Sequence, residues 1–106
     1  MLSIEDFRKI ELIVAQIKEV KEHPNADRLY LIQVDTGKDV RQIVAGIRKA
    51  YTPEQLIGRR VILVANLEPA VIRGEASNGM LLAASDETGM ALLLPEKDVA
   101  LGSIVK

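Results

Sequence analysis

The sequence predicts an all-β fold in the form of a small five-stranded barrel, and two observations carry that prediction. Short apolar segments with strand-like alternation recur along the chain, separated by Asn, Asp and Gly residues that favour turns. Only one short helical segment interrupts these strands. Short strands divided at regular spacing by turn signals are typical of small barrels and sandwiches.

The first segments predict a short helix and then an element of ambiguous type. Ser3 can cap a helix opening at Ile4, because Asp6 stands three positions further on and completes a capping box. We expect Phe7 to pack this helix onto the body. The apolar positions of residues 10–20 fit a helical stripe, and their β-branched content fits a long bent strand, so periodicity leaves both open.

A hairpin and a short helix follow. Strict alternation predicts a strand over 29–35, a Gly-containing turn comes next, and a second strand runs over 40–45. Thr52 then caps a helix with Pro53 at its first position and Gln55 closing a capping box. Gly58 is the expected helix end.

The remaining strands complete the predicted barrel. The run 59–67 is apolar after its two arginines, as in a central strand. Asn78-Gly79 predicts a tight turn, with strands over 79–85 and 90–94 after it. A lone short helix between the third and fourth strands is the pattern of the oligonucleotide-binding (OB) barrel, which is a five-stranded, partly open Greek key.

Composition excludes most catalytic classes. The 106 residues fit one domain over 1–106. With no cysteine and one histidine, the chain offers neither a thiolate nucleophile nor an N/S zinc site. It also lacks a phosphate-binding Gly-Lys-Ser/Thr loop and a nucleophile elbow. We therefore predict no enzyme activity, no cofactor and no metal. Without a signal peptide or apolar span, we expect a cytoplasmic protein with no membrane partner.

Charge is unevenly distributed, although the net charge is only −1. Residues 41–73 hold six basic and two acidic side chains, whereas 1–40 and 74–106 are both net acidic. Such a segment can form a basic face on a nearly neutral protein. The three aromatic residues are too few for a base-stacking platform. A nucleic-acid partner would therefore be bound by its backbone and shape.

Five stretches of the sequence carry a resemblance to a known family. They are HPNADRLY (23–30), RQIVAGI (41–47), YTPEQLIGRRVILVANL (51–67), RGEASNGMLLAA (73–84) and LLLP (92–95). In this order they resemble the structure-specific tRNA-binding domain of stand-alone tRNA-binding proteins and of the C-terminal domain or beta subunit of methionyl-tRNA synthetases. The resemblance implies an OB barrel, a homodimer, binding of tRNA with little sequence preference, and a strand over 10–20.

The candidate tRNA-binding residues combine this resemblance with side-chain chemistry. Arginines can meet phosphates, and Asn, Ser and Met lie in the matching stretches or at a strand end. The candidates are Asn25, Arg28, Arg41, Arg48, Asn66, Arg73, Ser77 and Met80. Building the turn is an equally good role for Asn25. His23 is expected to brace the loop or lie on the surface, without a chemical role.

Two departures from the family pattern keep a second function open. The family often has Leu-Arg-Val-Gly where this chain has Leu12-Ile13-Val14-Ala15, and it often has a lysine soon after the position of Pro69. The alternative is a dimerisation or protein-interaction module of a synthetase with little RNA affinity. The expected partners are tRNA, a second copy of the chain and methionyl-tRNA synthetase.

Overall fold

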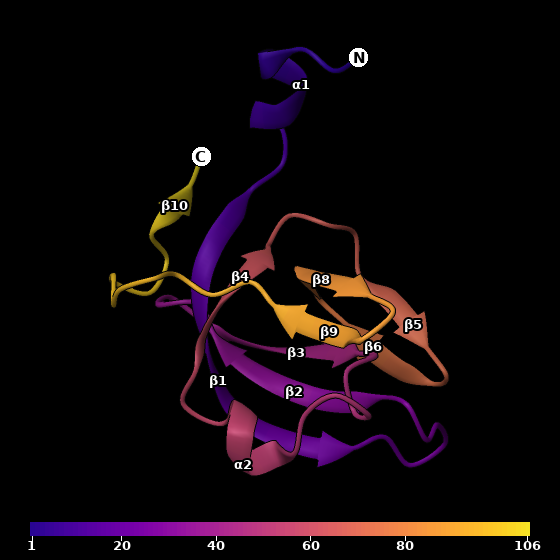
Figure 1. The fold of residues 1–106 in the computed structure, drawn as a ribbon. Coiled ribbons are helices and arrows are strands. Elements are labelled where there is room, and N and C mark those ends of the chain that lie inside the picture. The colour runs from indigo at the N-terminus through magenta and orange to yellow at the C-terminus, as the bar shows by residue number, and fades with distance from the viewer.

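The chain folds into a strongly curled antiparallel sheet that leaves an open half-barrel, as seen in a computed structural model describing residues 1–106 (Figure 1). Its strands are β1 (Leu12–Glu22), β2 (Tyr30–Asp35), β3 (Val40–Ala45), β4 (Arg60–Val64), β7 (Met80–Leu81) and β10 (Ile104–Val105). The order is β3-β2-β1-β4-β7, with β10 paired to the start of β1. The all-β, OB-like prediction is confirmed.

Strand β1 organises the sheet because it pairs with β2, β4 and β10. Its register against β2 shifts between Ile17 and Glu19, and such a bulge bends the strand and increases its twist. The strand expected over 10–20 is thus observed over 12–22, and the helical stripe in this segment had no structural meaning. Alternation in β2 buries Tyr30, Ile32 and Val34 on the core side.

Helix α2 (Pro53–Leu56) closes one end of the half-barrel below the sheet (Figure 1). The Thr52 hydroxyl accepts from the Gln55 amide, and the Gln55 side chain accepts from the Thr52 amide, so the predicted capping box is present. Leu56 is fully buried in the main core cluster. Gly58 follows with φ +91°, a left-handed conformation that suits glycine at a helix end.

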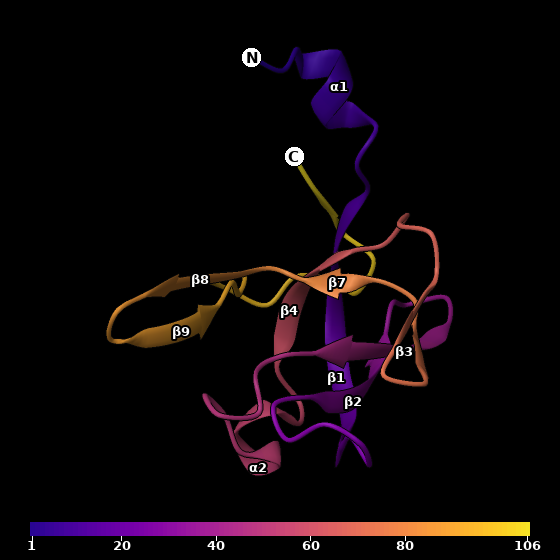
Figure 2. The same cartoon turned by 90° about the vertical axis from the view of Figure 1, so that its right-hand side faces the viewer.

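Helix α1 (Ile4–Arg8) has the predicted capping box but buries no residue. It stands away from the sheet, above the body in Figures 1 and 2. The expectation that Phe7 packs this helix down was wrong, since Phe7 is 38% exposed. The segment before β1 is instead held by Asn66, whose side chain bonds to the backbone of Lys9 and Glu11. Neither helix has the length and apolar character needed to cross a membrane.

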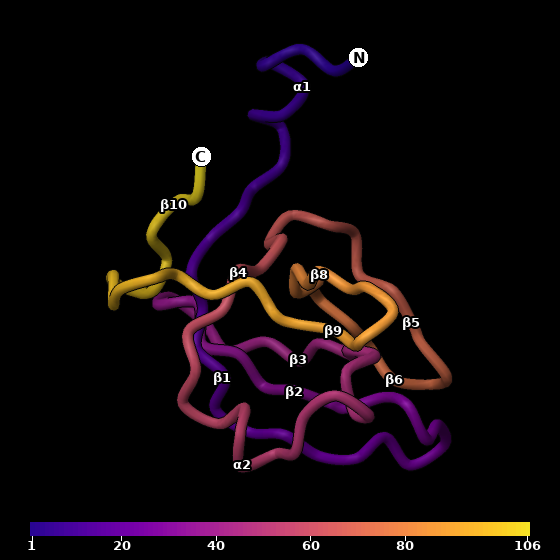
Figure 3. Tube along the Cα trace, viewed as in Figure 1, coloured from indigo at the N-terminus to yellow at the C-terminus, as the bar shows by residue number.

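Two hairpins extend from the sheet, β5 (Ala70–Ile72) with β6 (Glu75–Ser77) and β8 (Ala83–Asp86) with β9 (Gly89–Leu92). The single strand predicted over 79–85 was wrong: β7 pairs with β4, whereas β8 pairs with β9. In Figure 2 the β8–β9 hairpin extends outward from the body beyond β7, and Figure 3 traces the chain through the same hairpin. An apolar run cannot reveal which strand it pairs with.

Candidate nucleic-acid interface

Two segments far apart in sequence meet at one end of the sheet. The loop 23–29 joins β1 to β2, and the Arg73-Gly74 turn joins β5 to β6. Both central residues of that turn have positive φ, +53° and +90°, which is the pattern of a type I′ hairpin. Arg73 Nη2 donates to the Asn25 carbonyl at 2.9 Å, so the loop and hairpin are in contact (Figure 1, right-hand side).

The loop and the turn enclose an open hollow of about 440 Å³, called here the rim hollow. Its lining residues are Asn25, Ala26, Asp27, Arg28, Leu29 and Arg73. Arg28 is exposed and its guanidinium has no hydrogen bond or ion pair within the chain. Arg73 uses one N–H on Asn25, which leaves most of its five donors free. The lining holds two guanidiniums and one carboxylate, that of Asp27, so the rim hollow suits an anionic ligand.

His23 lies behind the rim hollow, only 3% exposed. Its Nδ1 accepts from the Asn25 amide at 3.0 Å, and its Nε2 lies 3.1 Å from the Ile72 carbonyl oxygen. An acceptor at Nδ1 requires the proton at Nε2, which can then donate to Ile72. The loop-bracing expectation for His23 agrees with this geometry, whereas the surface alternative does not.

Two of the candidate arginines have intramolecular partners. Arg48 donates to the Ala26 carbonyl at 3.3 Å and forms an ion pair with Glu22 at 2.7 Å, so it supports loop 23–29 from behind. Arg41 donates to the Ala65 carbonyl at 2.6 Å and pairs with Asp39 at 3.2 Å, at the far end of the sheet. Neither lines the rim hollow. A direct contact of either arginine with RNA stays a prediction.

Asn66 and Ser77 likewise bond to backbone. The Asn66 amide accepts from Glu11 N–H at 2.8 Å and donates to the Lys9 carbonyl at 2.7 Å. Ser77 is 4% exposed; its hydroxyl accepts from Val44 N–H and donates to the Gly79 carbonyl. These bonds satisfy peptide groups that no strand neighbour reaches. Their role in RNA contact also stays a prediction.

Met80, the last candidate, is 49% exposed and lies away from the rim hollow. It borders an apolar hollow of about 250 Å³ between β3 and the β8–β9 hairpin, together with Val44, Ile47, Leu81 and Leu92 among others. The structure thus brings Asn25, Arg28 and Arg73 together and separates Met80 from them.

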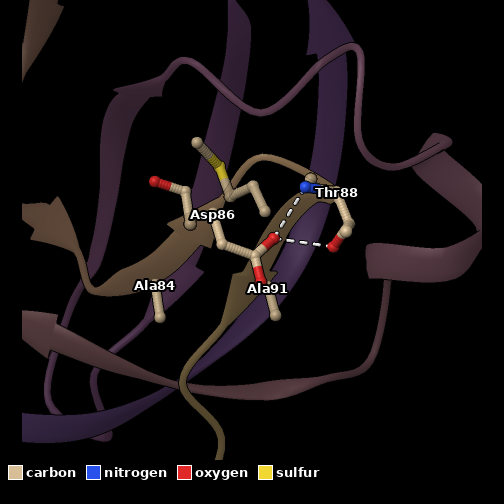
Figure 4. Close-up of a pocket in the computed structure, with 7 residues that line it drawn as sticks. Ala84, Asp86, Thr88 and Ala91 are labelled. Atoms are coloured by element: carbon tan, nitrogen blue, oxygen red, sulfur yellow. Dashed lines mark hydrogen bonds between the residues drawn. The ribbon is translucent and has the colours of Figure 1, made fainter.

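A further hollow of about 360 Å³ lies on the β8–β9 hairpin (Figure 4). Asp86 Oδ1 accepts from the Thr88 amide at 2.8 Å and the Thr88 hydroxyl at 2.6 Å. The hydroxyl bond is the main cause that lowers the pKa of Asp86. This carboxylate holds the turn in shape, and no basic side chain lines the hollow. It therefore lacks the positive charge that the rim hollow has.

The fold and the rim hollow define a class: an OB-like half-barrel whose loop end presents cationic side chains, which is a nucleic-acid-binding architecture. Residues 12–104 match the family described as "Putative tRNA binding domain". The match covers most of the chain, and the chain belongs to this family.

Curated relatives and solved structures agree with that membership. The chain is 55% identical to the methionine–tRNA ligase of Pyrococcus horikoshii over 105 residues, which is 99% of this chain and 14% of that protein. The chain thus spans about a seventh of such relatives. A MetRS-related protein from Pyrococcus horikoshii is similar at TM-score 0.93 and 32% identity, covering 100% of this chain and 98% of that one.

A second solved structure extends the comparison. The CsaA chaperone protein from Picrophilus torridus has a TM-score of 0.93 at 28% identity, and the match covers all of both chains. The same domain is therefore similar both to part of a long ligase and to short chains of its own size.

Sequence reasoning missed the links between loop 23–29 and the β5–β6 hairpin. The Arg73-Gly74 pair was a usable signal, because two adjacent residues between short apolar segments can form a type I′ turn. The sequence could not predict the hydrogen-bond partner of His23, because Ile72 lies 49 residues away and contributes only its backbone carbonyl. Any residue at position 72 could supply that acceptor.

Proposed function

We propose that this domain binds folded tRNA through its sugar-phosphate backbone and overall shape, with little sequence preference, and that it does so as a homodimer. It acts free-standing or as part of a methionyl-tRNA synthetase, in the cytoplasm, and catalyses no reaction itself. The family membership supports the class of partner.

The observation that carries the proposal is the pair of exposed guanidiniums, Arg28 and Arg73, on one hollow. Arginine binds phosphate with paired N–H donors, and such contacts release counterions from the nucleic acid. The hollow has no aromatic lining, so splayed bases have no stacking surface there. These features favour a structured RNA over an unfolded strand.

Homodimer formation has separate support from the exposed apolar side chains at the ends of the chain. On α1 and before it, Leu2, Ile4 and Phe7 are exposed, and Ile104 of β10 is 74% exposed. A five-residue helix with no buried residue is too short to be stable in water by itself. A second copy of the chain is the partner that would cover these residues.

The test is competition binding with a labelled tRNA at low salt. Unlabelled bulk tRNA should displace the label, while a single-stranded homopolymer of equal length should compete at least about tenfold less well. Affinity should fall steeply with salt, because each phosphate contact releases counterions. Equal competition by the homopolymer would contradict recognition of shape. Absence of any binding would favour the dimerisation module instead.

A further inference from the structure

Loop 23–29 carries Asn25 and Arg28, and it has few contacts that could fix its position relative to Arg73. Within the loop, the Leu29 carbonyl accepts from the His23 amide at 3.1 Å. Across to the β5–β6 hairpin, two side chains make the connection: Arg73 to the Asn25 carbonyl, and His23 to the Ile72 carbonyl. The first of these bonds is exposed to solvent, whereas the second is part-buried.

We propose that His23 is a positioning residue of the rim hollow, which joins loop 23–29 to the β5–β6 hairpin so that Arg28 and Arg73 meet the same tRNA together. This inference rests on the proposed function. The imidazole is buried and cannot itself meet RNA, so any effect on binding is transmitted through the two segments it joins.

The imidazole is suited to this task because its two nitrogens face opposite partners. Nδ1 accepts from Asn25 within the loop, and Nε2–H donates to Ile72, one residue before Arg73. Fixing both segments before RNA arrives removes an ordering cost from binding. Losing the Nε2 bond leaves only the exposed Arg73–Asn25 bond between the loop and the hairpin, so part of that ordering cost returns.

Two amide variants, each able to replace one of the two ring nitrogens, separate the two bonds. In His23→Asn, the side-chain oxygen can take the place of Nδ1 and keep the Asn25 bond, but nothing reaches Ile72. In His23→Gln, the side-chain NH₂ can take the place of Nε2 and keep the Ile72 bond. We expect His23→Asn to weaken tRNA binding about fivefold and His23→Gln to stay within about twofold of the wild type.

The control is Gln16→Met, which removes one side-chain bond to the Gly58 carbonyl beside α2 and should leave tRNA affinity unchanged. Melting temperatures are measured for all variants. Equal losses of affinity in His23→Asn and His23→Gln, in step with a loss of stability, would make His23 merely structural and overturn the proposal.

A double-mutant cycle shows whether His23 acts through Arg73. Arg73→Asn removes the guanidinium while keeping a residue that tolerates positive φ. If His23 positions Arg73, then adding His23→Asn to Arg73→Asn should cost less affinity than His23→Asn costs in the wild type. Fully additive losses would overturn the inference.

Nitrogen NMR of the imidazole gives a readout independent of affinity. The Nε2–H tautomer is expected in the free protein and in the tRNA complex, and the Nδ1–H tautomer would overturn the proposed bond to Ile72. If the wild-type protein binds no tRNA, the proposed function is contradicted. If the wild type binds tRNA and His23→Asn binds it equally well, only the positioning role of His23 is contradicted.

Discussion

At the scale of single residues, Arg73 is in a conformation that its side chain disfavours. A non-glycine residue in the left-handed region costs roughly 1–2 kcal/mol, and Asn is the residue that accepts this conformation most readily after Gly. Asn-Gly is also the preferred pair in type I′ turns. An arginine here is best explained by what its guanidinium does at the rim hollow, since local turn stability alone favours asparagine.

We predict that Arg73→Asn separates stability from binding. The variant relieves the backbone strain, so its melting temperature should equal or exceed that of the wild type, while tRNA affinity falls about tenfold with loss of a phosphate contact. Thermal unfolding and titration with tRNA check both parts. Arg73→Ala is the comparison and should lose affinity equally but be less stable. Wild-type affinity in Arg73→Asn would show that the guanidinium meets no RNA.

Arg28 allows a cleaner prediction because its side chain has no partner within the chain. Arg28→Ala should leave the melting temperature within about 2 °C of the wild type, since exposed substitutions change stability little. Its tRNA affinity should fall for all tRNAs alike, and the salt slope should decrease by about one. Lys38→Ala, in the turn between β2 and β3, is the matched control. An unchanged slope in Arg28→Ala would place Arg28 outside the interface.

The candidate residues show what residue type can and cannot predict. The sequence pointed to cationic and amide side chains as candidates, but it could not show which of them had intramolecular partners. Arg48 and Arg28 look alike in sequence, yet Glu22 and the Ala26 carbonyl engage only Arg48. Those partners depend on how the chain folds back behind the loop, which periodicity does not encode.

At the scale of elements, the turn between β2 and β3 is held by a carboxylate. The Thr36 hydroxyl donates to Asp39 Oδ1 at 2.6 Å, and Arg41 lies beside the same carboxylate. The Thr36 hydrogen bond is the main cause that lowers the pKa of Asp39 below its ordinary 3.8, and Arg41 adds to it. A group with a lowered folded-state pKa stabilises the fold when ionised.

We predict that Asp39→Asn lowers the melting temperature at neutral pH, because the amide lacks the charge that Thr36 and Arg41 favour. The contribution of Asp39 is fully present above 3.8 and is lost as the pH falls through the lowered pKa. The gap in melting temperature between wild type and variant should therefore close as the medium is acidified below 3.8. A gap that is constant across this range would mean that charge plays no part.

Element boundaries were well predicted where a local rule applied. Both capping boxes and the 40–45 strand occur as expected, because capping and hairpin turns depend on residues three or four positions apart. The segment 79–94 was less predictable. Its division between the main sheet and a separate hairpin depends on pairing with β4, which lies far away in sequence.

At the scale of the whole molecule, the apolar surface is concentrated at projecting parts. Helix α1 stands above the body with Phe7 exposed, and β10 lies near its base with Ile104 exposed (Figures 1 and 2). The β8–β9 hairpin also reaches outward, and an isolated two-stranded hairpin is at best marginally stable. The exposed apolar side chains of these parts would be stabilised by packing against a partner, whereas the sheet already packs on its own core.

We predict that the protein is a homodimer whose interface includes α1. Light scattering at micromolar concentration should give twice the chain mass of 11.6 kDa. The variant Phe7→Asp places a charge in the expected apolar contact and should give monomers that keep the sheet and its circular dichroism. Ile57→Asp, at a 52% exposed position after α2, is the matched control and should stay dimeric.

The same variants connect assembly with binding. The melting temperature of the wild type should rise with protein concentration, because association stabilises the folded state by mass action, whereas that of Phe7→Asp should not. A dimer also presents two rim hollows, and a tRNA that reaches both is bound more tightly than one copy can bind it. Phe7→Asp should then lose affinity although Arg28 and Arg73 are untouched. Monomeric wild-type protein at all accessible concentrations would contradict the dimer, and undiminished tRNA binding by a monomeric Phe7→Asp would show that one rim hollow suffices.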